Sequence, residues 1–151
     1  MKKYAMWVHG TAVQPEREGY HINKARAGFG ARFSSTGSEW FHFAVPTPVI
    51  ADGQNTTLEQ AFVLYRTTMT THIIAVHLYD GRGLVHKVEP LNWSGDHGGG
   101  LDQQTLLPAP ANLHVKFGLG ISIAVAFGDS TPSGVPSIEF VSAGADFLVP
   151  G

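Results

Sequence analysis

The 151-residue chain has the length of one domain and can bury about two thirds of its unfolded surface without disulfides or a structural metal. It contains no cysteine, which excludes a disulfide framework, thiolate catalysis, zinc fingers and iron–sulfur clusters. The formal net charge is −2, with 15% charged residues and a pI of about 6.4, so we expect no nucleic acid partner.

The N-terminal half of the chain alternates its side chains over short stretches, which indicates β-strands. Strands are predicted at residues 1–13, 20–23, 27–33 and 39–45. The last of these, EWFHFAV, places Phe41, Phe43 and Val45 on one face. Trp40 and His42 lie on the other face, and the prolines that follow end the strand because proline has no amide hydrogen to donate.

The C-terminal half continues this pattern after one helical turn predicted at residues 57–60. Strands are predicted at residues 61–69, 71–79, 84–88, 101–107, 113–127 and 137–147. The letters DGRG at residues 80–83 predict a tight turn and hence a hairpin. The final strand loses its alternation around residues 142–144, which predicts a β-bulge there.

Residues 113–127 (LHVKFGLGISIAVAF) form the longest alternating stretch, and the predicted fold is organised around it. Every odd position is large and apolar, and the even positions after residue 116 are small: Gly118, Gly120, Ser122, Ala124 and Ala126. A straight strand of this length would span about 50 Å at roughly 3.3 Å per residue, so we expect a bend or bulge near Gly118 or Gly120.

The two faces of this stretch predict different environments. We expect the odd face to pack in a two-sheet core opposite Phe41, Phe43 and Phe62. The even face allows close approach, so we expect something bulky to cover residues 118–126: another sheet, an indole such as that of Trp40, a ligand or a second subunit. The low charge content adds to the expectation of a homo-oligomer.

Roughly nine strands follow one another at spacings near ten residues, and the sequence shows no amphipathic helix longer than about two turns. We therefore predict an all-β fold: a single-domain, jelly-roll-like antiparallel β-sandwich that spans residues 1–151. Apolar runs stay well short of a membrane span, so no membrane partner is expected. The start of the chain lacks the apolar segment of a signal peptide, which favours a cytoplasmic location.

His42 and Trp40 share a strand face and provide the minimum for acid–base chemistry, a titratable group beside an apolar wall. Asp96 or Glu39 would orient the imidazole. The alternative is that Trp40 lies in the core and His42 donates to a backbone carbonyl. The letters HGGG that begin at His97 match the oxyanion loop of lipases, but the sequence lacks the GxSxG elbow that this loop serves. We expect a mobile glycine-rich loop, or a pocket rim that brings Asp96 and His97 over a ligand.

The residues present also bear on two further kinds of site, a metal centre and a sugar-binding platform. Eight histidines are enough for a zinc or iron site, but no HxH pair occurs, so we expect neither a metal nor a cofactor. Exposed aromatic residues such as Trp93 or Tyr79 would form a platform on which a sugar ring stacks. The candidate ligand-binding residues are Trp40, His42, Trp93, Asp96 and His97, and the candidate catalytic residues are His42, Asp96 and His97.

Four segments stand out beyond these local patterns. They are WVHG at residues 7–10, WFHFAVPTP at 40–48, GLGISIAV at 118–125 and FVSAGADF at 140–147. Together they resemble a family of small uncharacterised bacterial proteins, a domain of unknown function. The resemblance covers nearly the whole chain and implies a single β domain of bacterial origin, but it brings no activity, ligand or catalytic residue.

The sequence favours a non-enzymatic binding or self-assembly module, because no group of residues has catalytic spacing while the small-residue face suggests a packing partner. One alternative is a small cofactor-independent enzyme of the cyclase, isomerase or lyase type, with His42 as acid or base in an aromatic pocket. The other is a lectin-like carbohydrate-binding module. The expected partners are a second copy of the chain and a small molecule or a glycan.

Overall fold

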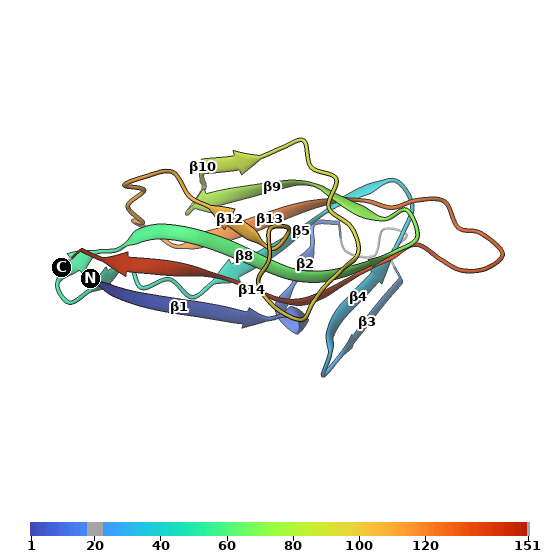
Figure 1. Cartoon of the computed structure of the whole chain (residues 1–151), viewed down its shortest axis with the longest axis horizontal. Coiled ribbons are helices and arrows are strands. Elements are labelled where there is room, and N and C mark those ends of the chain that lie inside the picture. Colours follow the sequence, from blue (N-terminus) through green and yellow to red (C-terminus); the bar gives the residue numbers. More distant parts are fainter. Residues whose placement is uncertain (18–22, 151) are drawn as a thin grey trace.

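The computed structural model describes residues 1–17 and 23–150 and has two β-sheets packed face to face (Figure 1). The seven-stranded sheet contains β1 (Lys2–His9), β3 (Asn23–Ala27), β4 (Gly30–Ser34), β8 (Thr57–Thr68), β11 (Asp96–His97), β12 (Leu106–Pro108) and β14 (Ser137–Val149). The five-stranded sheet contains β2 (Gln14–Pro15), β5 (Ser38–Val45), β9 (His72–Asp80), β10 (Gly83–Val88) and β13 (Leu119–Ala126). A small ribbon joins β6 (Ile50–Ala51) to β7 (Gln54–Asn55), and a 3-10 turn, η1 (Gly10–Ala12), follows β1.

Two long strands lie at the centres of the sheets. In the larger sheet β14 pairs with β8 on one side, and on the other side with β1 and β4, which follow one another along it. In the smaller sheet the order is β10-β9-β13-β5-β2, so β13 has a neighbour on both sides. The pairs within both sheets are antiparallel, which confirms the predicted all-β antiparallel sandwich.

Aromatic rings fill the space between the sheets. The ring of Phe140 on β14 lies 5.1 Å from that of Phe41 and 5.8 Å from that of Phe43, both on β5. Phe33 on β4 lies 4.8 Å from Phe41. All four are essentially inaccessible to solvent. Each buried ring removes enough apolar surface from water to contribute about 2 kcal/mol, so this cluster is a main source of cohesion between the sheets.

The odd-numbered face of β13 does point into this core, as its alternation predicts. However, Ile121 pairs with Phe43, and Ile123 with Phe41, so these phenylalanines lie beside the apolar face of β13 rather than opposite it. The expectation for Phe62 is wrong as well. Its side chain lies on the outer face of the larger sheet, where its ring is 4.1 Å from that of Trp7.

The long strand predicted at residues 113–127 is shorter in the structure. The predicted bend occurs at Gly118, whose φ of 145° takes it out of the extended conformation, and β13 begins directly after it. The residues before the bend leave the sheet, because Val115 donates its amide hydrogen to the carbonyl of Thr56. That bond ties the segment to the start of β8 instead.

Other predicted boundaries shift because pairing with a neighbouring strand overrides local preference. The helical turn predicted at residues 57–60 is wrong: these residues begin β8 and pair with β14. The strand predicted at 27–33 contains the turn between β3 and β4, and the one at 101–107 shortens to β12. The hairpin at 80–83 is confirmed.

The last strand has a bulge just before residues 142–144, where the sequence predicts it. The register of β14 against β8 shifts between Phe140 and Ser142, and again between Asp146 and Phe147. The strand predicted at residues 20–23 lies almost wholly outside the described residues. Within the described part of the chain, no helix has the length and apolar character needed to cross a membrane.

We predict that Phe140→Ala lowers the free energy of unfolding by about 3–5 kcal/mol, because it removes the ring that contacts both phenylalanines of β5 and leaves a cavity. Urea denaturation followed by circular dichroism measures the change. Phe29→Ala, at a position with 37% exposure, is the control and should cost much less. Equal losses in the two variants would contradict the assignment of the core.

Candidate functional site

A groove runs along the outer face of the five-stranded sheet, with β13 as its floor. The outward residues of β13 are small: Gly120, Ser122 and Ala124. Each lies in register between two neighbours, one on β5 and one on β9. The rows are Trp40–Ala124–Ala75, His42–Ser122–His77 and Ala44–Gly120–Tyr79. Larger side chains on the flanking strands therefore rise on both sides of a low floor.

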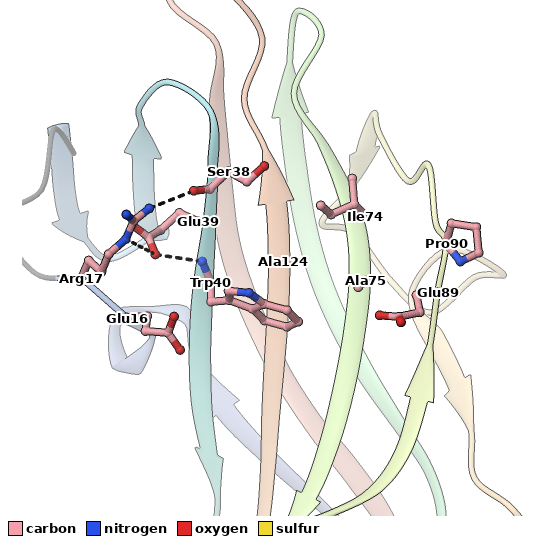
Figure 2. Close-up of a pocket in the computed structure, with 10 residues that line it drawn as sticks. All are labelled: Glu16, Arg17, Ser38, Glu39, Trp40, Ile74, Ala75, Glu89, Pro90 and Ala124. Atoms are coloured by element: carbon pink, nitrogen blue, oxygen red, sulfur yellow. Dashed lines mark hydrogen bonds and ion pairs between the residues drawn. The ribbon is translucent and has the colours of Figure 1, made fainter.

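The indole of Trp40 crosses this floor. Its ring centroid lies 4.8 Å from that of His77, although the two residues belong to strands on opposite sides of β13. Figure 2 shows the indole lying over Ala124 and directed toward β9. As a result Ala124 is only 3% exposed, and Ser122, which bonds to His42, is 7% exposed. The prediction that something bulky covers this face is confirmed for Ala124, where the cover is the indole of Trp40 (Figure 2).

Trp40 divides the groove into two adjoining cavities. The first has a volume of about 750 Å³ and extends from Glu39 across Ala75 to Glu89 and Pro90. The second has a volume of about 620 Å³ and is lined by the residues of the second row, by Gly120 and Tyr79 of the third, and by Gly81 and Arg82. Glu16 and Trp40 line both, so the cavities form one continuous open groove.

Hydrogen bonds fix the polar side chains of the groove. Nδ1 of His42 lies 2.8 Å from the hydroxyl of Ser122, and its Nε2 lies 3.1 Å from Glu16. On the opposite wall Nε2 of His77 lies 2.8 Å from the carboxylate of Glu89. The His77 hydrogen bond holds the pKa of Glu89 below its ordinary value. Both imidazoles are thus held at defined positions, with a carboxylate beside each one.

A buried carboxylate supports the Trp40 end of the groove. Glu39 is 3% exposed, and Arg17 donates to its side chain at 3.2 Å. The same carboxylate accepts the backbone amide hydrogen of Trp40 at 3.0 Å (Figure 2). A buried carboxylate needs such partners to offset its desolvation. Their arrangement fixes the backbone from which the indole projects.

The structure separates the other predicted site residues from this groove. Asp96 and His97 form β11, which pairs with β8 in the seven-stranded sheet. His97 bonds to Asp102 at 2.8 Å, which raises the pKa of His97, and Asp96 pairs with Arg66 at 3.3 Å. Neither residue is among those that line the groove around His42, whose imidazole is oriented by Glu16 and Ser122. The predicted loop over a shared pocket is therefore not assembled, because β11 and β5 belong to different sheets.

Trp93 also lies outside the groove. Its backbone exchanges two hydrogen bonds with Ile73 at the edge of β9, and its side chain packs against the core. Tyr79, the other predicted stacking residue, does line the groove. His77 lines the groove but is not among the residues selected from the sequence. The alternation of its strand could have identified it, because it lies on the same face as Tyr79. No sequence pattern indicates Glu16 or Glu89, since each reaches the groove from a turn or a strand end.

In residues 1–17 and 23–150, histidine, aspartate and glutamate side chains form no group of three or more that could hold a metal ion. The two histidines of the groove walls flank Ser122, and each bonds to its own carboxylate. The arrangement is suited to hydrogen bonding with a ligand.

A fixed turn closes one end of the sheet beside the groove. The carboxylate of Asp80 accepts hydrogen bonds from the backbone amides of Lys116, Phe117 and Gly118, at 2.8–3.1 Å. Partial burial raises the pKa of Asp80, but the three amides outweigh it, and the pKa lies below its ordinary value. The charged carboxylate therefore holds the loop that precedes β13.

Comparison with known proteins gives one family and two solved structures. A family model described as "Family of unknown function (DUF6623)" matches residues 1–149. No curated protein matches this chain. A structure of TmCBM61 in complex with β-1,4-galactotriose is 16% identical, covers 90% of this chain and 86% of that one, and gives a TM-score of 0.43. The exo-β-1,3-galactanase Pc1,3Gal43A from Phanerochaete chrysosporium, with galactose, is 16% identical with a TM-score of 0.36. That match covers 97% of this chain and only 29% of the galactanase.

We predict that Asp80→Asn lowers the free energy of unfolding at pH 7 by about 1 kcal/mol, because the carboxylate accepts these hydrogen bonds with both oxygens and a neutral amide has only one acceptor oxygen. Because the folded pKa of Asp80 is lowered, its stabilising contribution is present above the unfolded pKa, about 4, and is lost as the pH falls through the folded value. The stability of the variant should therefore fall less between pH 6 and pH 3. Denaturation at a series of pH values measures this, with Asp129→Asn, an exposed loop position, as control. Parallel pH profiles for wild type and Asp80→Asn would contradict it.

Proposed function

The chain belongs to the DUF6623 family, a family of unknown function, and from the groove itself we propose that it is a carbohydrate-binding module. The family membership confirms the resemblance that the four sequence segments predict. The observation that carries the proposal is the position of Trp40, whose indole stands in the middle of an open groove between two cavities with hydrogen-bonding groups along their walls.

A pyranose ring has two kinds of surface that match this groove. Its C–H face packs against an aromatic ring, and Trp40 and Tyr79 offer such rings at separate points along the groove. Its hydroxyl groups both donate and accept hydrogen bonds. Glu16 and Glu89 would accept from hydroxyls, while Arg82 would donate to them.

The shape of the groove favours a chain over a single compact molecule. The two cavities continue into one another past Trp40, and both are open to solvent along their length. Binding pockets for compact small molecules are usually enclosed and enclose most of the ligand surface. A sugar chain laid along β13 would instead contact several residues in turn while its other side stays hydrated.

Acid–base catalysis on the bound ligand is the second candidate function. The observation in its favour is the hydrogen-bonded series of Glu16, His42 and Ser122, which resembles the order acid, imidazole and hydroxyl of a catalytic triad. The strand does not favour Ser122 as a nucleophile, however. β13 pairs with strands on both sides, so the backbone amides near Ser122 serve the sheet rather than an oxyanion. Chromatography of a bound oligosaccharide after prolonged incubation tests this candidate, and a product that disappears with His42→Ala would establish it.

We predict that the wild-type protein binds oligosaccharides on a glycan array and that Trp40→Ala weakens this affinity at least about tenfold, because the stacking surface is lost. Isothermal titration calorimetry with β-1,4-linked gluco-, xylo- and galacto-oligosaccharides of one to six units measures the change. Trp7→Ala is the matched control, since Trp7 is 46% exposed on the other sheet, and it should bind normally. A wild-type protein that binds no glycan would overturn the proposal.

Gly120→Val provides a test that leaves Trp40 in place. A Cβ at Gly120 would have its nearest neighbours at 3.9 Å, so the substitution should fold, and valine is favoured in strands. Its methyl groups would rise from the floor into the second cavity. We expect a thermal unfolding midpoint close to that of the wild type and a clear loss of oligosaccharide affinity. Unchanged affinity in a folded Gly120→Val protein would place the ligand elsewhere.

A further inference from the structure

Phe117 is the most exposed phenylalanine, tryptophan or tyrosine among the described residues, and its backbone is held in place. Its side chain is 77% exposed. Its amide hydrogen is bonded to Asp80 together with those of its two neighbours, and the carbonyl of Gly118 accepts from the amide of Gly81. An apolar ring is thus presented to water from a loop fixed by four hydrogen bonds.

The ring of Phe117 lies at the end of the groove. A Cβ placed on Gly81 would lie 3.0–3.3 Å from atoms of the Phe117 side chain, so the ring packs directly over Gly81. Gly81 and Arg82 line the second cavity together with Tyr79. Phe117 therefore lies directly beside a residue that lines the second cavity.

Two more features set this end apart from an ordinary exposed side chain. Leu84, which is 48% exposed, pairs with Tyr79 across the β9–β10 hairpin and therefore shares its outward face. Scattered single apolar residues are normal on protein surfaces, but here Phe117, Leu84 and Tyr79 gather around one end of a groove. Arg82 stands among them, and it forms no ion pair with another described residue.

We propose that Phe117 and Arg82 form an outer subsite that binds a sugar unit beyond those held at Trp40 and Tyr79. This rests on the proposed carbohydrate-binding function and extends it to ligand length. The ring of Phe117 supplies the apolar platform, and the guanidinium of Arg82 donates to hydroxyl oxygens at its side. Because Asp80 fixes the loop in advance, little conformational freedom is lost when the subsite is filled. The protein therefore binds longer oligosaccharides with higher affinity than short ones.

The test is a length series on the full chain. Affinities are measured by calorimetry for the β-1,4-linked gluco-, xylo- or galacto-oligosaccharides of one to six units that the wild type binds. Phe117→Ala should weaken binding of the longer members by about tenfold and leave the shortest bound member unchanged, whereas Phe117→Tyr should retain full affinity. Phe29→Ala, another exposed phenylalanine on the other sheet, should bind every member like the wild type.

The possible outcomes separate the two proposals. Wild-type affinity that rises with chain length, and a Phe117→Ala loss confined to the long members, would support the outer subsite. If Phe117→Ala has the affinity of the wild type at every length while Trp40→Ala loses binding, the outer subsite is wrong but the proposed carbohydrate-binding groove is retained. If the wild type binds no oligosaccharide, both fail. A Phe117→Ala loss that is equal for short and long members would also overturn the subsite, since it would report on the fold of the loop.

Discussion

The register of β13 between β5 and β9 is the constraint on which the groove depends. Ile121 and Ile123 are fully buried against the phenylalanine core, so the strand cannot slip by one residue without exposing them. With those side chains fixed inward, Gly120, Ser122 and Ala124 must face outward. The low floor of the groove is therefore a direct consequence of core packing on the other side of the same strand.

The small floor in turn decides where the large side chains of the neighbouring strands go. With no bulk between them, Trp40 on β5 reaches His77 on β9, and the indole rests on Ala124 instead of pointing into water. The charged residues then reinforce this placement. Glu39 holds the backbone of Trp40 from one side, while His77 is bonded to Glu89 on the other. The result is a preorganised aromatic surface, which is the property that limits the entropic cost of binding.

The strand alternation predicted most of the fold and part of the site. It gave the two faces of the EWFHFAV strand, the hairpin after Asp80 and the bend at Gly118, because these depend on local periodicity and on turn residues. It failed at residues 57–60, where pairing with β14 outweighs a short helical preference. It also failed to separate His42 from Asp96, since a sequence does not state which of two sheets a short segment such as β11 will join.

By itself, the sequence determined that the chain is all-β and that residues 119–126 have one large apolar face and one face of small residues, because side-chain alternation is written directly in the order of the residues. It also placed Trp40 and His42 on one face of one strand. Only the tertiary structure decided that Tyr79 and His77 stand across from them, that Glu16 and Glu89 reach the same groove, and that Phe117 lies at its end. These proximities join residues far apart in the chain, and they arise from strand pairing and sheet packing, which local periodicity does not encode.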